Sequence, residues 1–234
     1  MKIAGVAVEE GQVAELVRRQ LEDGIVWNDQ EDQDAVEGLS RAMRVSGAMR
    51  PAFGQALADL LADRNITVRT GAVSALQDFA HLVGADRLAE LLRDQPELYS
   101  NVKPQGYRLG FEELETAMYA LLGNAATPSD SAAIEQLREG ARKGQSVVLP
   151  ALARLDPDWL VRNARDIVPR QAIGGVLIKL PSQAHREKVL KALAPWPDPD
   201  DVLSKPFWEM VPGNVDALRR ILGEQEEDKV LGDG

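Results

Sequence analysis

The chain has 234 residues, a formal net charge of −10 and no cysteine, which excludes a disulfide framework and any metal site or nucleophile built on cysteine. Aromatic residues make up only 5% of the chain while hydrophobic residues make up 44%, which favours helices packed through small and aliphatic side chains over a β-sandwich. Because the N-terminus turns acidic too soon for a secretory signal peptide, and no apolar run approaches the ~18 residues of a membrane-spanning helix, we expect a cytoplasmic protein without a membrane segment.

Helical periodicity dominates the chain. Residues 2–8 fit either a short strand or an extended lead-in to the first helix, and we favour the lead-in because a lone strand has no evident partner. Beyond them, apolar residues recur at helical spacing, and glycine or proline follows most of these stripes. In chain order we expect helices at 9–22, 34–46, from Pro51 onwards, 66–83, 85–94, 111–123, 130–142, 146–155, 157–168, 170–180, 182–194, 200–211 and 214–222. Short connectors make neighbouring helices antiparallel.

Two segments interrupt this pattern. Residues 28–34, NDQEDQD, form an acidic linker. It is not a calcium loop, because no placement of its aspartates supplies both alternating oxygen ligands and a glycine at the sixth position. Residues 95–110 hold two prolines, two glycines and no helical stripe. A loop of this length is often functional or marks a boundary between packed units.

One turn motif occurs twice. In LADLLADRNITVRTGA and in LPALARLDPDWLVRNA, a leucine stripe ends at an aspartate, and Val-Arg follows five and six residues later. The motif residues are Asp63 and Arg69 in the first copy, and Asp156 and Arg162 in the second. The aspartate can cap the following helix or reach the arginine, and the arginine can pair across the turn or with the next helix pair. In the second copy, Pro157 at the first helical position makes Asp156 an N-cap candidate.

These two segments resemble HEAT repeats, of the armadillo type. The resemblance implies an all-α fold, a right-handed superhelical stack of antiparallel helix pairs in one domain over residues 1–222, followed by a frayed acidic tail at 223–234. It also implies that the four motif residues form structural ladders between stacked pairs. One helix pair cannot bury its apolar face alone, so repeats stack and leave a concave surface. Families of this kind mostly bind other macromolecules, so we expect a non-enzymatic interaction or scaffold module.

No pattern in the chain points to catalysis. We find no HExxH, GxSxG or phosphate-loop glycine motif. The two histidines, His81 and His185, lack the further ligands that a metal site needs, and we expect both to be structural. The sequence therefore predicts no catalytic residue, no metal and no cofactor.

Charge is unevenly distributed along the chain. Residues 138–220 carry 14 Lys+Arg against 10 Asp+Glu, and the remaining residues carry 13 against 27. If 157–168 and 182–194 are both second helices of their pairs, their cations face one groove. We therefore expect an acidic protein, or this protein's own acidic N-terminal half, to bind there, and the 95–110 loop is the alternative surface. The expected partner-binding residues are Trp159, Arg165, Lys188 and Lys191, since Trp and Arg are favoured anchors.

An enzymatic alternative is a HEAT-like alkylpurine DNA glycosylase. That family uses Trp, Arg and Asp on a basic concave face, and the nearest stretch here holds Asp158, Trp159, Arg162 and Arg165. A net charge of −10 repels duplex phosphates, so we do not expect a nucleic-acid partner.

Overall fold

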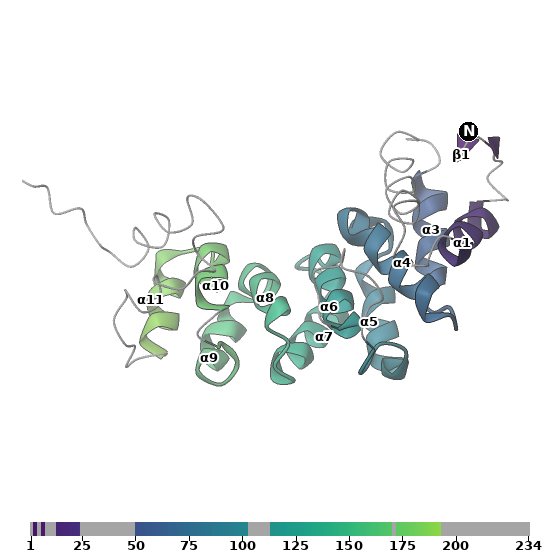
Figure 1. The fold of residues 1–234 in the computed structure, drawn as a ribbon. Helices are drawn as coiled ribbons and strands as arrows, with labels where there is room; N and C mark the ends of the chain where they lie inside the picture. The colour runs from purple at the N-terminus through teal and green to yellow at the C-terminus, as the bar shows by residue number, and fades with distance from the viewer. Residues whose placement is uncertain are drawn as a thin grey trace, which may run out of the picture. The chain divides into compact units, whose positions relative to one another are not determined.

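A computed structural model describes residues 2–3, 6–7, 13–23, 50–102, 113–169 and 172–192. Within these ranges the protein is all-α except for one short strand pair, as the sequence predicts (Figure 1). The chain divides into two compact units, Met1–Val148 and Leu149–Gly234, and each is described by itself. The single domain over 1–222 stays a prediction, and the 223–234 tail lies outside the described residues.

The N-terminal segment contains the strand pair. Strand β1 (Lys2–Ile3) pairs with β2 (Val6–Ala7) in antiparallel register, with Lys2 opposite Ala7. Our preference for an extended lead-in is therefore wrong. The partner that a lone strand needs is supplied by the next few residues of the same segment.

The first unit is built from helices whose bounds agree with the periodicity to within a few residues. They are α1 (Val13–Asp23), α3 (Arg50–Leu60), α4 (Ile66–Leu76), η3 (Gln77–Leu82), α5 (Ala85–Asp94), η4 (Pro96–Leu98), α6 (Leu114–Ala125), α7 (Ser131–Arg142) and η6 (Ser146–Val148). The helix expected over 66–83 is α4 continued by η3, with a kink at Phe79. The helix expected at 34–46 lies outside the described residues.

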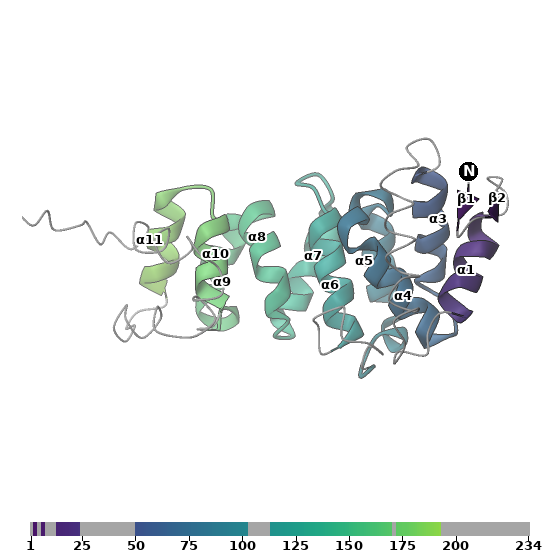
Figure 2. The same cartoon turned by 45° about the horizontal axis from the view of Figure 1, so that its top comes forward.

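In the first unit, α1 packs against α3 and α4, and α5 packs against both α6 and α7 (Figure 2). Helix α6 also packs against η3. Two glycines allow close approach. A Cβ atom at Gly54 would lie 2.6 Å from Leu82 Cβ, and one at Gly140 would lie 2.7 Å from the ring of Tyr119. Real Cβ atoms do not come this close, so glycine sets the packing distance at both contacts. The core is aliphatic with buried tyrosines, and includes Leu57, Leu61, Leu76, Leu88, Tyr99, Leu114 and Tyr119.

The second unit contains four described helices, α8 (Leu149–Leu155), α9 (Pro157–Ile167), α10 (Ile173–Lys179) and α11 (Gln183–Ala192). Helix α8 packs against α10, and α9 packs against both α8 and α11. The core between them contains Leu152, Leu160, Val176, Leu177 and Val189. The helices expected at 200–211 and 214–222 lie outside the described residues.

Helix α10 contains two adjacent glycines, Gly174 and Gly175. A Cβ atom at Gly175 would lie 3.9 Å from Pro150 Cγ, which is ordinary van der Waals contact. The α8–α10 contact therefore does not depend on a glycine at this position, in contrast to the contacts at Gly54 and Gly140.

Candidate functional site

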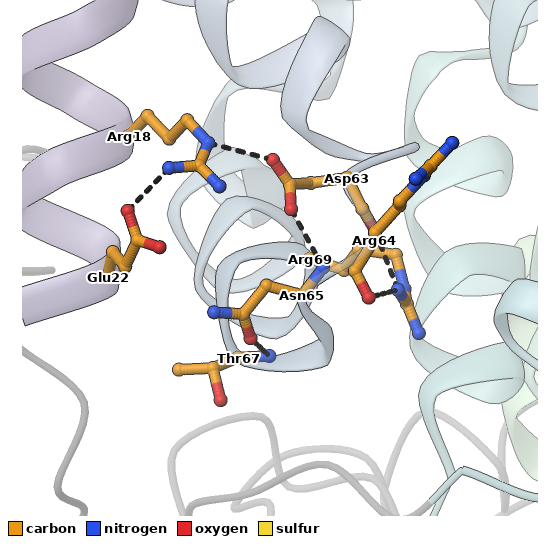
Figure 3. A network of polar contacts seen from close by, with 7 residues as sticks. All are labelled: Arg18, Glu22, Asp63, Arg64, Asn65, Thr67 and Arg69. Carbon is orange, nitrogen blue, oxygen red and sulfur yellow. Dashed lines mark hydrogen bonds and ion pairs between the residues drawn. The ribbon is translucent and has the colours of Figure 1, made fainter.

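The first copy of the turn motif joins α3 to α4 through local hydrogen bonds (Figure 3). The N-cap of α4 is Asn65, whose Oδ1 accepts from the backbone N–H of Thr67 at 2.9 Å. Asp63 lies before the cap, and its Oδ1 accepts from the backbone N–H of Asn65 at 2.8 Å. The expectation that Asp63 caps the following helix is therefore wrong for this copy. Asp63 instead closes an Asx turn that presents Asn65 to the helix.

The buried side chain of Arg69 forms further hydrogen bonds within the same turn. It is 6% exposed, and its Nη1 donates to the backbone oxygens of Asp63 at 2.6 Å and Arg64 at 3.1 Å. Arg69 thus pairs across the turn with carbonyls and not with the Asp63 carboxylate. Its Nε is buried without a hydrogen-bond partner.

Two further side chains tie this turn to its surroundings. The Tyr99 hydroxyl donates to the backbone oxygen of Leu61 at 2.8 Å, and burial raises the pKa of Tyr99 to about 12. On the other side, Arg18 Nε of α1 donates to Asp63 Oδ2 at 3.0 Å and the same guanidinium pairs with Glu22. The hydrogen bond to Asp63 raises the pKa of Arg18. These contacts link α1, the α3–α4 turn and the 95–102 segment, which agrees with the structural role predicted for Asp63 and Arg69.

The second copy has a different geometry. Asp156 is the N-cap of α9, its Oδ1 accepting from the backbone N–H of Trp159 at 3.3 Å, and Pro157 is the first helical residue. This cap confirms the expectation for Asp156. Arg162 lies on the exposed surface of α9, whereas Arg69 is buried. The two arginines therefore differ in exposure, and the structural role expected of Arg162 stays a prediction.

The predicted partner-binding residues lie on α9 and α11, which contact each other. Arg165 on α9 and Lys188 and Lys191 on α11 are exposed. Trp159 is 9% exposed, so its ring belongs to the core of the second unit. Of the four predicted residues, Arg165, Lys188 and Lys191 are therefore accessible to a partner, and Trp159 is not. We call the exposed side of these two helices the α9–α11 face.

A hydrogen-bonded chain that the sequence analysis missed also links these helices. His185 Nδ1 lies 2.6 Å from Ser182 Oγ, and His185 Nε2 lies 3.2 Å from Asp158 Oδ1. Ser182 precedes α11, and its Oγ also accepts from the backbone N–H of His185 at 3.3 Å. The spacing Ser-x-x-His at a helix start was visible in the sequence as a capping pattern. The contact with Asp158, 27 positions away, depends on how α9 and α11 pack.

The order Ser–His–Asp invites comparison with a nucleophilic triad. In a triad the carboxylate is buried and orients the imidazole, but the Asp158 side chain is 72% exposed. Ser182 Oγ is also used in capping α11. The arrangement therefore fits a surface hydrogen bond between two helices and a helix cap better than nucleophilic catalysis.

The irregular segment expected at 95–110 is described as far as residue 102, and the rest lies outside the described residues. Its described part contains η4 and the buried Tyr99. The backbone oxygen of Val102 accepts from the N–H of Leu114 at 2.9 Å, which anchors the segment to the start of α6. The described half is thus part of the packing of the first unit.

Among the described residues, no group of three or more His, Cys, Asp or Glu side chains could hold a metal ion. In the same part of the chain, no helix combines the length and apolarity needed to cross a membrane. No protein-family model, curated protein or solved structure matches this chain.

Proposed function

We propose that the protein is a HEAT-like interaction module, without catalytic activity, that binds an acidic segment of another protein on its α9–α11 face. The observation that carries this proposal is the exposure of Arg165, Lys188 and Lys191 on two helices that pack side by side. The four helices of the second unit support the repeat assignment. They form two successive pairs in which α8 meets α10 and α9 meets α11, so first helices contact each other and second helices contact each other, as stacked repeats require.

The first unit supports the same assignment. The helix formed by α4 and η3 is followed in the chain by α5, α6 and α7. Here η3 packs against α6, and α5 packs against α7. The contacts again join alternate helices along the chain, as α8–α10 and α9–α11 do in the second unit. The chain thus repeats one packing rule in both units, which is the behaviour of antiparallel pairs in an α-solenoid.

The charge of the second unit favours an acidic partner. Residues 149–192 carry 8 Lys+Arg against 4 Asp+Glu, although the whole chain is strongly acidic. On α7, Arg138 and Arg142 form ion pairs with Glu135, and Arg142 also pairs with Glu139, so the positive charge of these two side chains is locally compensated. An acidic segment on the α9–α11 face would supply complementary charge and accelerate association.

Two features favour a protein over duplex DNA. The overall charge of −10 opposes the phosphate neutralisation on which DNA affinity depends. The indole of Trp159 is buried and cannot stack on a base without disturbing the core. The glycosylase alternative needs that side chain at the surface.

The test is charge reversal with a matched control. The variant Arg165→Glu, Lys188→Glu, Lys191→Glu alters the α9–α11 face, and Lys143→Glu, Arg154→Glu, Lys179→Glu makes the same change in net charge at other exposed positions. Both are used with wild type to capture partners from nuclease-treated extract, and affinity is then measured for the purified partner. We expect the first variant alone to lose binding, and wild-type affinity to fall with salt. Equal binding by all three proteins would exclude this face.

A further inference from the structure

Asp158 is one of three exposed acidic side chains on the helices of the proposed binding face, with Asp166 on α9 and Glu187 on α11. Asp158 precedes Arg162 by four residues and Arg165 by seven, so the three side chains follow one another along the exposed side of α9. The carboxylate of Asp158 is 72% exposed. Its negative charge repels any acidic segment that approaches the neighbouring arginines. The charge state of this position therefore matters for the proposed partner.

His185 contacts that carboxylate from α11. Its Nε2 lies 3.2 Å from Asp158 Oδ1, and its side chain is 22% exposed, which leaves the ring open to proton exchange with water. We propose that protonation of His185 neutralises Asp158 and so tightens the binding of an acidic peptide segment to the α9–α11 face. This inference rests on the proposed function and adds its regulation.

The hydrogen bonds of His185 suit both charge states. In the neutral ring, Nε2–H donates to Asp158 and Nδ1 accepts from the hydroxyl of Ser182. In the charged ring both nitrogens donate, and Ser182 Oγ accepts, while it still accepts from the backbone N–H of His185. Because neither state breaks a contact, a proton can add to the face without displacing α11 from α9. Histidine is the side chain whose charge normally changes between pH ~5 and ~8.

The charges around His185 set the direction of the effect. Three helices carry charged groups that bear on His185. These groups are Asp158, Arg162, Arg165 and Asp166 on α9, Lys179 on α10, and Arg186, Glu187, Lys188 and Lys191 on α11. Arg186 is directed to the backbone oxygens of Leu177 and Leu180. With His185 charged, the remaining exposed cations of α9 and α11 act without opposition from Asp158, so affinity for an acidic segment rises as pH falls.

The experiment measures fluorescence anisotropy of a labelled peptide of alternating Asp and Glu at about pH 5.5 and about pH 8 in low salt. We expect the wild type to bind about 3- to 10-fold more tightly at the lower pH, as one added charge near the peptide allows. His185→Gln keeps a donor for Asp158 and should bind with little pH dependence. Asp158→Asn should bind tightly at both pH values. His81→Gln, which changes the exposed histidine of η3, is the control and should keep the wild-type pH dependence.

The outcomes separate this inference from the proposed function. Suppose that the Arg165, Lys188, Lys191 reversal abolishes peptide binding, but wild type and His185→Gln show the same pH dependence. This result overturns the inference and leaves the proposed function standing. Peptide binding that is unaffected by the reversal, or absent at both pH values, overturns both. A duplex DNA probe of equal charge serves as the other arm, and tighter binding of DNA than of the peptide would also overturn both. Urea unfolding of each variant at both pH values checks that the second unit stays folded.

Discussion

The two copies of the turn motif share their letters but not their structure. In the first, Arg69 is buried and donates to the carbonyl oxygens of Asp63 and Arg64. In the second, Arg162 is exposed on α9. The difference teaches that a motif's spacing has structural meaning only relative to the residue at which the helix begins.

The helix starts explain the difference. Helix α4 is capped by Asn65 and begins at Ile66, so Arg69 is its fourth residue. Helix α9 is capped by Asp156 and begins at Pro157, so Arg162 is its sixth residue. Two residues rotate a side chain by about 200° around a helix axis. The same Asp-to-Arg spacing therefore directs one arginine into the turn and the other to the surface.

The largest expected effect tests this comparison directly. Arg69→Ala should lower the free energy of unfolding by about 2–4 kcal/mol, because it removes charge-assisted bonds to two carbonyls and leaves a cavity. Arg162→Ala should change it by no more than about 0.5 kcal/mol, as at other exposed positions. Urea unfolding of both variants measures the difference. Equal tolerance of the two changes would mean that the turns are alike after all.

The second prediction sharpens the comparison through Tyr99, which binds Leu61 in the first turn. Its pKa in the folded protein is about 12, above the value of about 10 expected in the unfolded chain. Burial of the neutral phenol therefore adds roughly 2–3 kcal/mol to the free energy of unfolding. This contribution is fully present below about pH 10 and is lost as the pH rises towards about 12. Unfolding should be followed across this range in wild type and in Tyr99→Phe.

The Tyr99→Phe variant should lack this part of the pH dependence while keeping the part that comes from Tyr119, whose pKa burial also raises. At neutral pH it should be less stable than wild type by about 1–2 kcal/mol, because the backbone oxygen of Leu61 loses its buried donor. Parallel curves for the two proteins would show that the Tyr99 hydroxyl is not shielded from water.

The smallest expected effect concerns the caps. Asn65→Ala and Asp156→Ala should each lower stability by about 1 kcal/mol, because each removes the oxygen that accepts an N–H of the first helical turn. Asp166→Ala, an exposed change within α9, is the control and should be close to neutral. If Asn65→Ala proved neutral while Asp63→Ala were costly, the assignment of the α4 cap to Asn65 would be contradicted.

The helices were largely predictable, since a 3.6-residue apolar period with glycine or proline at its ends is a local property. It located α5 and α7 almost to the residue, and Pro157 identified Asp156 as a cap. The strand pair was not predicted because four residues are too few to show the alternating pattern of a strand. An extended lead-in to the first helix therefore fitted them equally well. The exposed cations of α9 and α11 were predicted from charge alone, but the burial of Trp159 was not, because an amphipathic residue near a helix start fits the core as well as the surface.

The sequence by itself thus determined where the described helices lie and which of their faces are apolar, because both follow from periodicity within a dozen residues. The tertiary structure alone decided which side chains meet. Arg18 reaches Asp63 across 45 positions, Tyr99 reaches Leu61 across 38, and His185 reaches Asp158 across 27. Such contacts depend on the rotation of each helix about its axis and on its packing against a neighbour, and a rotation of one residue, about 100°, is enough to remove them.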